Sequence, residues 1–205
     1  MLAVRNLECV RGERRLFSAL GFELAPGALL QIEGSNGSGK TSLLRMLCGL
    51  LPATAGEICW RGQPIAELGE QYRADIAYLG HENAVKEELS ALENVALCTR
   101  LRGDKPTRHT ITQALNTFGL QGRERLPAKY LSQGQRRRVA LTCLSLTRRA
   151  LWLLDEPFNA LDVRAVELVA DLLSEHLQGG GIALISTHQD VTIPGATMRR
   201  LRLDS

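Results

Sequence analysis

The sequence predicts an α/β fold with a helical insertion, and three observations carry this prediction. Residues 28–33 form a short apolar run that is followed at once by a glycine-rich loop and a helical pattern. Two further apolar runs, 151–154 and 182–186, have the length of buried parallel strands and flank a helical pattern at 163–177, as in a βαβ crossover. Residues 82–148 are mostly helical in pattern. We therefore expect a core built from both ends of the chain, with a helical part inserted in the middle.

The remaining elements follow from local patterns. Apolar patterning and turn residues predict further strands at 2–8, 19–24, 56–60 and 76–79. The helix after the glycine-rich loop starts at Thr41 and stops before Pro52, which cannot continue it. In the insertion we expect helices at 90–101, 107–118 and 133–148. Ser90 and Glu93 have the spacing of a capping box at the start of the first of these helices.

Composition and charge indicate a folded globular chain. Of its 205 residues, 44% are hydrophobic and 23% charged, which is close to the globular average. The apolar run 150–154 is far shorter than the ~20 residues that span a bilayer, and the N-terminus has no apolar stretch of signal-peptide length. We therefore expect the chain to stay in the cytoplasm. The five cysteines are scattered without a C-x-x-C pair, which is typical of reduced cysteines without a metal or disulfide.

The balance of 25 basic and 22 acidic residues gives a net charge of +3, which is too weak to imply a nucleic-acid partner. The tightest basic cluster is the arginine run 136–138. Three consecutive residues of a helix point in three directions, so we expect these arginines to be solvated.

A phosphate-binding loop follows the first buried strand. The run is Gly34-Ser35-Asn36-Gly37-Ser38-Gly39-Lys40-Thr41, with Ser42 next. It satisfies the phosphate-loop pattern and stands between a strand and a helix, as that pattern requires. The loop N–H groups and the helix N-terminus attract an anion, Lys40 reaches the terminal phosphates, and Thr41 places its hydroxyl on Mg²⁺. The alternative, a flexible Gly/Ser turn with a stray lysine, leaves the flanking strand and helix unexplained.

Two carboxylates, Asp155 and Glu156, follow the apolar run 151–154. With a phosphate loop upstream, we expect Asp155 to meet magnesium through water. Glu156 is then placed to polarise the attacking water as a general base. Taken alone, the pair is also compatible with an N-cap for the next helix.

The segment Leu131-Ser132-Gln133-Gly134-Gln135 begins the third helix of the insertion. A serine at a helix start is usually only a cap. The order of phosphate loop, this signature segment, the Asp-Glu strand, residues 159–162 and His188 nevertheless resembles the ATP-binding-cassette (ABC) ATPases over nearly the whole chain. That resemblance implies a P-loop NTPase core with a mixed sheet, a small N-terminal antiparallel β part and a helical subdomain. It implies one domain over 1–205, with a core at about 1–81 and 149–205 and a helical subdomain at about 82–148.

In proteins of the ABC family, the signature segment of one chain closes over the phosphate loop of another. The resemblance therefore implies a homodimer that uses ATP and Mg²⁺. The signature residues expected at the nucleotide are Ser132, Gly134 and Gln135. The resemblance also assigns catalysis to Glu156, His188 and Lys40, with His188 contacting the γ-phosphate and holding Glu156 and water in line. Asp162 resembles the residue that communicates between the two sites.

Two positions depart from the family pattern. After the strand at 76–79 the family has a glutamine that contacts Mg²⁺, whereas this chain has His81. Imidazole is a poorer magnesium ligand than an amide oxygen, so we expect His81 to act on the metal through water, or to sense a membrane partner. In the family, an aromatic residue usually stacks on adenine. By its spacing from Gly34, that position falls near Arg11 in this chain, and Phe17 is the nearest downstream aromatic. A guanidinium plane can stack on a base, so we expect Arg11 to contact adenine.

A finer resemblance is to the ATP-binding subunits of cytochrome c maturation, the CcmA family. The segments that carry it are 79–94, 135–141, 151–152, 156–162 and 187–189. It implies integral membrane subunits of the cytochrome c maturation complex as partners, and a peripheral location on the cytoplasmic face of the bacterial inner membrane. ATP hydrolysis would then drive haem export or the release of haem-loaded chaperone. The cysteines and histidines form no C-x-x-C-H motif, so we expect no direct haem binding.

Other functions remain as alternatives. The closest is an ATPase subunit of an exporter with another substrate. A P-loop kinase would explain residues 34–41, but it would need an acceptor site and would leave residues 131–135 without a role. A DNA-repair cassette would need a long coiled-coil insertion, and a ribosome-acting factor would normally carry two cassettes. Neither fits 205 residues.

Overall fold

The computed structural model describes residues 1–203, which divide into two compact units. The core unit comprises residues 1–78, 149–157 and the described residues from 173 onward. The helical unit comprises residues 79–148 and 158–172. The sequence prediction placed residues 79–81 and 158–172 in the core, whereas they group with the helical unit in the structure.

The first sheet of the core unit is antiparallel and has the strand order β2-β1-β4-β5. Its strands are β1 (Leu2–Arg11), β2 (Arg14–Leu24), β4 (Ala55–Trp60) and β5 (Gln63–Pro64). β1 and β2 form one long hairpin, paired from Leu2 with Leu24 to Arg11 with Arg14, with register shifts on the way. Both strands are longer than the sequence predicted. The residues beyond the predicted bounds, 9–11 and 14–18, mix three arginines with apolar side chains and show no regular apolar alternation.

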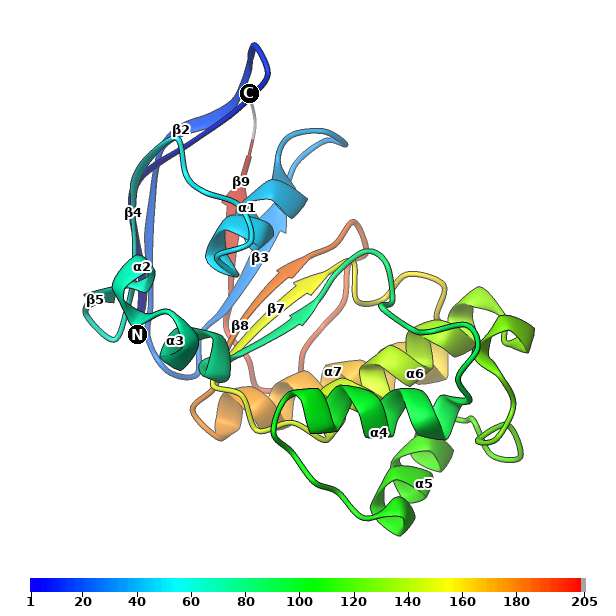
Figure 1. Cartoon of the computed structure of the whole chain (residues 1–205). Coiled ribbons are helices and arrows are strands. Elements are labelled where there is room, and N and C mark those ends of the chain that lie inside the picture. Colours follow the sequence, from blue (N-terminus) through cyan, green and yellow to red (C-terminus); the bar gives the residue numbers. More distant parts are fainter. Residues whose placement is uncertain (204–205) are drawn as a thin grey trace. The chain divides into compact units, whose positions relative to one another are not determined.

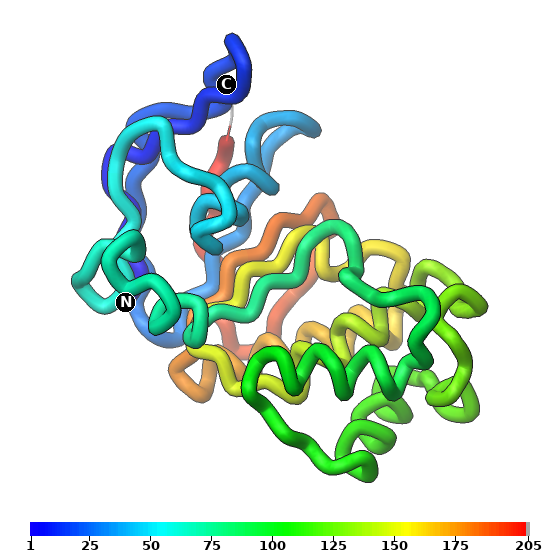
Figure 2. The backbone as a smooth tube through the Cα atoms, viewed as in Figure 1, coloured from blue at the N-terminus to red at the C-terminus, as the bar shows by residue number. Residues whose placement is uncertain are grey.

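The second sheet has the strand order β6-β7-β8-β3-β9. Its strands are β6 (Ile76–Leu79), β7 (Leu151–Asp155), β8 (Ile182–Ser186), β3 (Leu29–Glu33) and β9 (Met198–Arg202). β3 pairs in parallel with β8 and β9, and β7 in parallel with β8. In Figure 2 the blue β3 accordingly lies beside the orange and red strands from the far end of the chain. The predicted α/β fold class is confirmed, with the antiparallel and parallel parts as separate sheets.

Helix α1 (Lys40–Leu47) lies between these two sheets (Figure 1). Its apolar side chains pack into one cluster with residues of both sheets, including Leu2 of β1 and Leu153 of β7. The phosphate loop is therefore held at the N-terminus of a helix that is buried on both sides. Two short helices, α2 (Ile65–Leu68) and α3 (Glu70–Asp75), and the edge strand β9 were not predicted. Neither the two short helices nor the arginine-rich β9 has a long apolar pattern.

The helical unit packs three helices around an apolar cluster (Figure 1). The helices are α4 (Ala91–Leu101), α5 (Arg108–Thr117) and α6 (Gln133–Ser145), with a short 3₁₀ turn at Ala128–Tyr130. α7 (Val163–Gln178) begins in this unit and ends in the core unit. The predicted capping box of α4 is confirmed: the Ser90 hydroxyl accepts from Glu93 N at 3.2 Å, and the Glu93 carboxylate accepts from Ser90 N at 2.8 Å.

The expectation that the arginine run 136–138 is solvated was wrong. Arg136 donates to the Glu87 carboxylate at 2.6 Å. Arg137 is only 3% exposed and donates to Gly80 O at 3.0 Å. Arg138 forms an ion pair with Asp162. The three side chains do point in three directions, but packed loops with acceptor groups lie in each of them.

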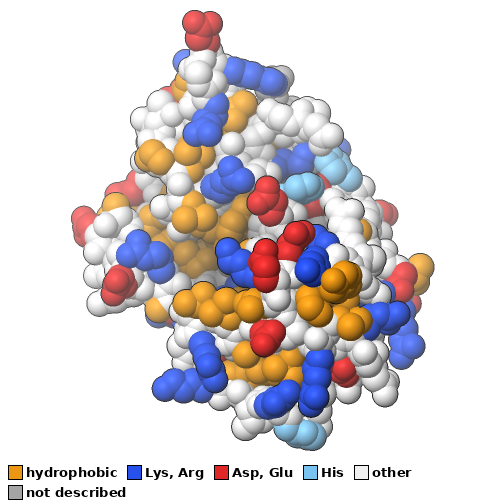
Figure 3. All heavy atoms as spheres, turned by 45° about the vertical axis from the view of Figure 1, so that its right-hand side comes forward, with side chains coloured by type: hydrophobic (Ala, Val, Ile, Leu, Met, Phe, Trp, Pro, Cys, Tyr) orange, Lys and Arg blue, Asp and Glu red, His pale blue; other side chains and the backbone are white. Residues whose placement is uncertain are grey.

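Charges elsewhere are mixed: on the face shown in Figure 3, basic and acidic side chains are interspersed. The five cysteines are free, and burial raises the pKa of the Cys48 thiol to about 12. Among residues 1–203, no helix combines the length and the apolar character that crossing a membrane requires.

A half-buried histidine, His176, lies near the C-terminal end of α7 and packs on the core unit. The His176 ring stacks on Trp152 of β7, with centroids 3.9 Å apart and planes 7° from parallel. Its Nε2 lies 3.2 Å from Ile182 O. Burial lowers the pKa of His176, and the hydrogen bond to Ile182 opposes that shift. The unfolded chain, in which a histidine has a pKa of about 6.5, therefore takes up this proton more readily than the folded chain.

We therefore expect the free energy of unfolding to fall as the pH drops below about 6.5, because the folded state disfavours the charged His176 ring. His176→Phe keeps an aromatic ring on Trp152 and removes the titrating group. Urea unfolding at pH 7.5 and 5.5 should show a smaller fall for the variant than for the parent chain. Equal falls in the two proteins would contradict the role given to His176.

Candidate nucleotide site

The start of the phosphate loop is closely packed, and position 34 has no room for a side chain. A Cβ at Gly34 would lie 2.5 Å from the Ser38 hydroxyl and 2.9 Å from Leu203 O. The following residues turn directly into α1, where Leu43 N donates to Gly39 O at 2.8 Å. The first turn of α1 carries no acidic side chain. The free N–H groups at this helix N-terminus thus present a positive electrostatic potential to the loop.

The polar groups of the loop are arranged to receive an anion. Lys40 is only 8% exposed, and its ammonium donates to Gly34 O at 2.7 Å and to Ser35 O at 3.2 Å. The Ser38 hydroxyl is buried and has no hydrogen-bond partner among residues 1–203. A buried hydroxyl without a partner is costly, and a phosphate oxygen would satisfy it. The residues present therefore fit a nucleotide phosphate chain.

Asp155 links this loop to the central strands. Thr41 Oγ1 donates to Asp155 Oδ2 at 2.7 Å, and Ser186 Oγ donates to Asp155 Oδ1 at 2.5 Å. The carboxylate is 2% exposed, so both of these hydrogen bonds offset the cost of burying its charge. Thr41 and Asp155 bring together oxygen atoms of the kind that Mg²⁺ prefers, so these residues fit the metal predicted from sequence. Sequence reasoning missed Ser186, because a serine at a strand end carries no motif.

Glu156 is held by its backbone and faces a histidine. Its N–H donates to Ser186 O and to Ser186 Oγ, both at 3.0 Å. Its φ of +49° lies in the left-handed region, which is unusual for a residue other than glycine, asparagine or aspartate. Glu156 Oε1 lies 3.5 Å from His188 Nε2, and His188 is half-exposed. Such strained positions gather at functional sites, where the surrounding structure fixes them.

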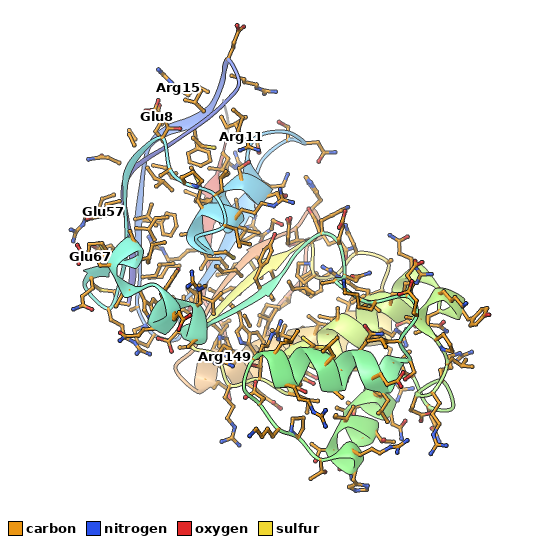
Figure 4. The ribbon with its side chains drawn as sticks, viewed as in Figure 1. Glu8, Arg11, Arg15, Glu57, Glu67 and Arg149 are labelled. Carbon is orange, nitrogen blue, oxygen red and sulfur yellow. The ribbon has the colours of Figure 1, made fainter. Side chains whose placement is uncertain are left out.

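The β1–β2 hairpin flanks the phosphate loop. A Cβ at Gly39 would lie 3.2 Å from the Phe17 ring, and a Cβ at Gly37 would lie 3.8 Å from Arg14 Nη1. Figure 4 shows Arg11 on the side of the hairpin turned toward α1, away from Glu8. Phe17 and Arg14 thus lie beside the loop, and Arg11 lies nearby. Sequence reasoning missed Arg14; the two-residue hairpin turn between Arg11 and Arg14 is the signal that places it there.

The signature residues form the start of α6 in the helical unit. Ser132 Oγ accepts from Gln135 N at 3.2 Å, and Gln135 Oε1 accepts from Ser132 N at 3.0 Å, which makes a capping box. Ser132 is exposed. The N-terminal turn of α6 therefore combines an exposed hydroxyl with a helix dipole, as an anion site does. His81 and Asp162 also belong to the helical unit.

Comparison with known proteins resolves the family. The family model described as ABC transporter matches residues 17–159. The cytochrome c biogenesis ATP-binding export protein CcmA of Dechloromonas aromatica is 57% identical over 99% of this chain and 100% of its own length. Its counterpart in Nitrosomonas europaea is 51% identical over 99% of this chain and 95% of its own.

The chain is an ABC ATPase of the CcmA family.

Solved structures agree with this fold. A dimeric bacterial ABC transporter cassette superposes with a TM-score of 0.84, at 23% identity, over 99% of this chain and 95% of its own. The same cassette in a dimeric post-hydrolysis state, bound to ADP and Pi, gives a TM-score of 0.80 at 24% identity, over 92% and 88% of the two chains. At these identities the likeness concerns the fold. In the CcmA-family chain, the phosphate loop, Asp155, Glu156 and His188 all belong to the core unit. The signature belongs to the helical unit.

Ser186→Ala should lower the free energy of unfolding by about 1–3 kcal/mol, because the buried Asp155 carboxylate loses a hydrogen bond. Urea unfolding measures this change. Ser145→Ala is the matched control: its hydroxyl donates to a carbonyl of its own helix, Thr142 O at 2.9 Å, and its loss should cost no more than about 0.5 kcal/mol. Equal, small effects of the two substitutions would show that Ser186 does not hold Asp155.

Proposed function

We propose that this CcmA-family chain is the ATP-hydrolysing subunit of a membrane exporter for cytochrome c maturation, which exports haem or releases haem-loaded chaperone. One observation carries the chemistry of the proposal. Thr41, Asp155, Glu156 and His188 converge beside the phosphate loop, at the carboxyl ends of parallel strands where α/β folds bind ligands. The assignment to cytochrome c maturation rests on the names of the full-length relatives.

Different residues of the core unit have different roles in the proposed phosphoryl transfer. Lys40, the loop N–H groups and the Ser38 hydroxyl bind the phosphates, and Thr41 and Asp155 would hold Mg²⁺. When bound, Mg²⁺ neutralises charge on the transferred phosphoryl group. Glu156 accepts a proton from the attacking water at its carboxylate. His188, 3.5 Å from that carboxylate, orients it and contacts the γ-phosphate.

A second copy of the chain completes the site. Each chain offers one phosphate loop in its core unit and one signature in its helical unit. The exposed Ser132 and the first-turn N–H groups of α6, among them that of Gly134, form a donor surface for phosphate oxygens. In a head-to-tail homodimer, this surface meets the nucleotide held by the other chain. Two solved cassettes of the same fold are described as dimeric, in keeping with a site built by two chains.

Glu156→Gln should lower ATP hydrolysis at least about 100-fold while leaving nucleotide binding intact, because an amide cannot accept the proton. ATP then persists between the chains and should stabilise a dimer, which light scattering after size exclusion detects. Glu167→Gln on the exposed face of α7 is the matched control and should behave like the parent chain. A folded, nucleotide-binding Glu156→Gln variant that stays monomeric at saturating ATP would contradict the proposal.

The membrane partner is expected to act through the loop that carries His81. This loop is held to α4, because the buried Asn94 side chain accepts a hydrogen bond from Lys86 N at 2.7 Å and donates one to Lys86 O at 3.0 Å. A partner that binds at residues 81–86 therefore acts on the whole helical unit. We propose that these partners are integral membrane subunits of the cytochrome c maturation complex, which would place the chain on the cytoplasmic face of the inner membrane.

His81→Gln should change basal or partner-stimulated ATP hydrolysis by about tenfold, because it removes the imidazole that is proposed to act on the metal through water or to sense the partner. The assay uses the chain alone and the complex purified with its membrane subunits. His109→Gln, at an exposed position on α5, is the control. Unchanged rates in both assays would exclude a role for His81. A complex whose membrane subunits belong to another exporter would overturn the assignment to cytochrome c maturation.

A further inference from the structure

Arg138 lies between three segments of the helical unit. Its Nη2 lies 2.6 Å from Asp162 Oδ2, and its Nη1 donates to Phe118 O, at the end of α5, at 3.3 Å. The side chain is 20% exposed. A Cβ at Gly119 would lie 2.6 Å from Nη1, so the guanidinium occupies the space that this glycine leaves. The end of α5 and the loop before α7 are thus both joined to the signature helix α6.

Asp162 has a second structural task. Its Oδ1 accepts from Ala165 N at 3.0 Å, which caps the start of α7. This backbone hydrogen bond and the Arg138 guanidinium lower the pKa of Asp162. One carboxylate therefore fixes both the beginning of α7 and the position of the loop that leads into it.

The same loop touches the signature turn directly. A Cβ at Gly134 would collide with Ala160 O, so only glycine allows the two segments to approach so closely. Ala160 has a φ of +61°, which turns its carbonyl within a tight turn closed by Leu161 N donating to Phe158 O at 3.3 Å. Residues 158–162 and the signature turn are therefore joined twice, by a backbone contact at Gly134 and by an ion pair one helical turn further along α6.

We propose that Arg138 is a positioning residue for ATP hydrolysis: by holding Asp162, it keeps residues 158–162 and the signature turn in one fixed arrangement that is presented to the nucleotide of the other chain. This inference rests on the head-to-tail dimer of the proposed function. Exposed ion pairs contribute little to stability, and Asp162 is 63% exposed, so the effect expected is on geometry. A misplacement of about 1 Å in a catalytic constellation is enough to slow a reaction about 100-fold.

The first test is a double-mutant cycle. Arg138→Met removes the guanidinium, and Asp162→Asn removes the charge but keeps an N-cap for α7. Each variant should lower kcat for ATP about tenfold, and the double variant should be no slower than the slower single one. Arg138→Lys should recover part of the rate. The affinity for ADP, which reports the phosphate loop of the same chain, should stay within about twofold of the parent value. Arg123→Met, at an exposed position of the same unit, is the matched control.

The second test asks whether the defect acts on the other chain. A Lys40→Ala chain has no working phosphate loop but keeps its signature, whereas an Arg138→Met chain has the reverse combination. Mixing the two should give more ATP hydrolysis than the sum of the separate chains, because mixed dimers contain one intact site. A mixture of Lys40→Ala with the signature variant Ser132→Arg serves as the reference. It measures how much ATP hydrolysis one intact site restores.

The outcomes separate this inference from the function it rests on. Recovery with both Ser132→Arg and Arg138→Met supports the positioning role. Recovery with Ser132→Arg alone overturns it, and so does a parental kcat for Arg138→Met or an additive cycle with Asp162→Asn. Absence of recovery with Ser132→Arg means that the signature does not act on the other chain, and then the proposed dimer fails together with this inference.

Discussion

The hydrogen bonds around the Asp155 carboxylate are the constraint on which the site depends. A carboxylate that is 2% exposed is tolerated only where donors compensate for its lost hydration, and Thr41 and Ser186 are two such donors. Through them Asp155 joins the first residues of α1 to the end of β8. Ser186 also receives the N–H of Glu156, so the same residue fixes the backbone of the proposed general base. The phosphate loop and the carboxylates thus keep one geometry.

In the helical unit, polar contacts likewise hold the signature turn in place. Ser132 at the start of its signature turn is exposed, so burial does not fix it. The capping box of Ser132 and Gln135 orders the turn itself. Behind it, consecutive arginines of α6 bind the surrounding loops: Arg137 donates to Gly80 O near His81, and Arg138 pairs with Asp162. Polar contacts from the following turn of the same helix thereby support the turn that is proposed to bind phosphate.

Sequence reasoning was strongest where a local pattern has one physical meaning. The buried strands β7 and β8 and the capping box at Ser90 were predicted because apolar runs and cap spacings act over a few residues. β9 was missed because this arginine-rich edge strand carries no apolar run. The partners of the arginine run 136–138 were missed for another reason. Helical periodicity gives the direction of each side chain, but only the folded loops show what lies there. Ser186 likewise acquires its role solely through the pairing of β7 with β8.

We propose that two copies of this CcmA-family chain build each ATP site, one with its phosphate loop and the other with its signature. The most direct measurement is a crystal structure of the Glu156→Gln chain with ATP and Mg²⁺. We expect a twofold dimer in which Ser132 Oγ and Gly134 N lie within hydrogen-bond distance of the γ-phosphate bound by Lys40 of the other copy. Two copies with bound ATP in which Ser132 and Gly134 face away from every triphosphate would contradict the claim.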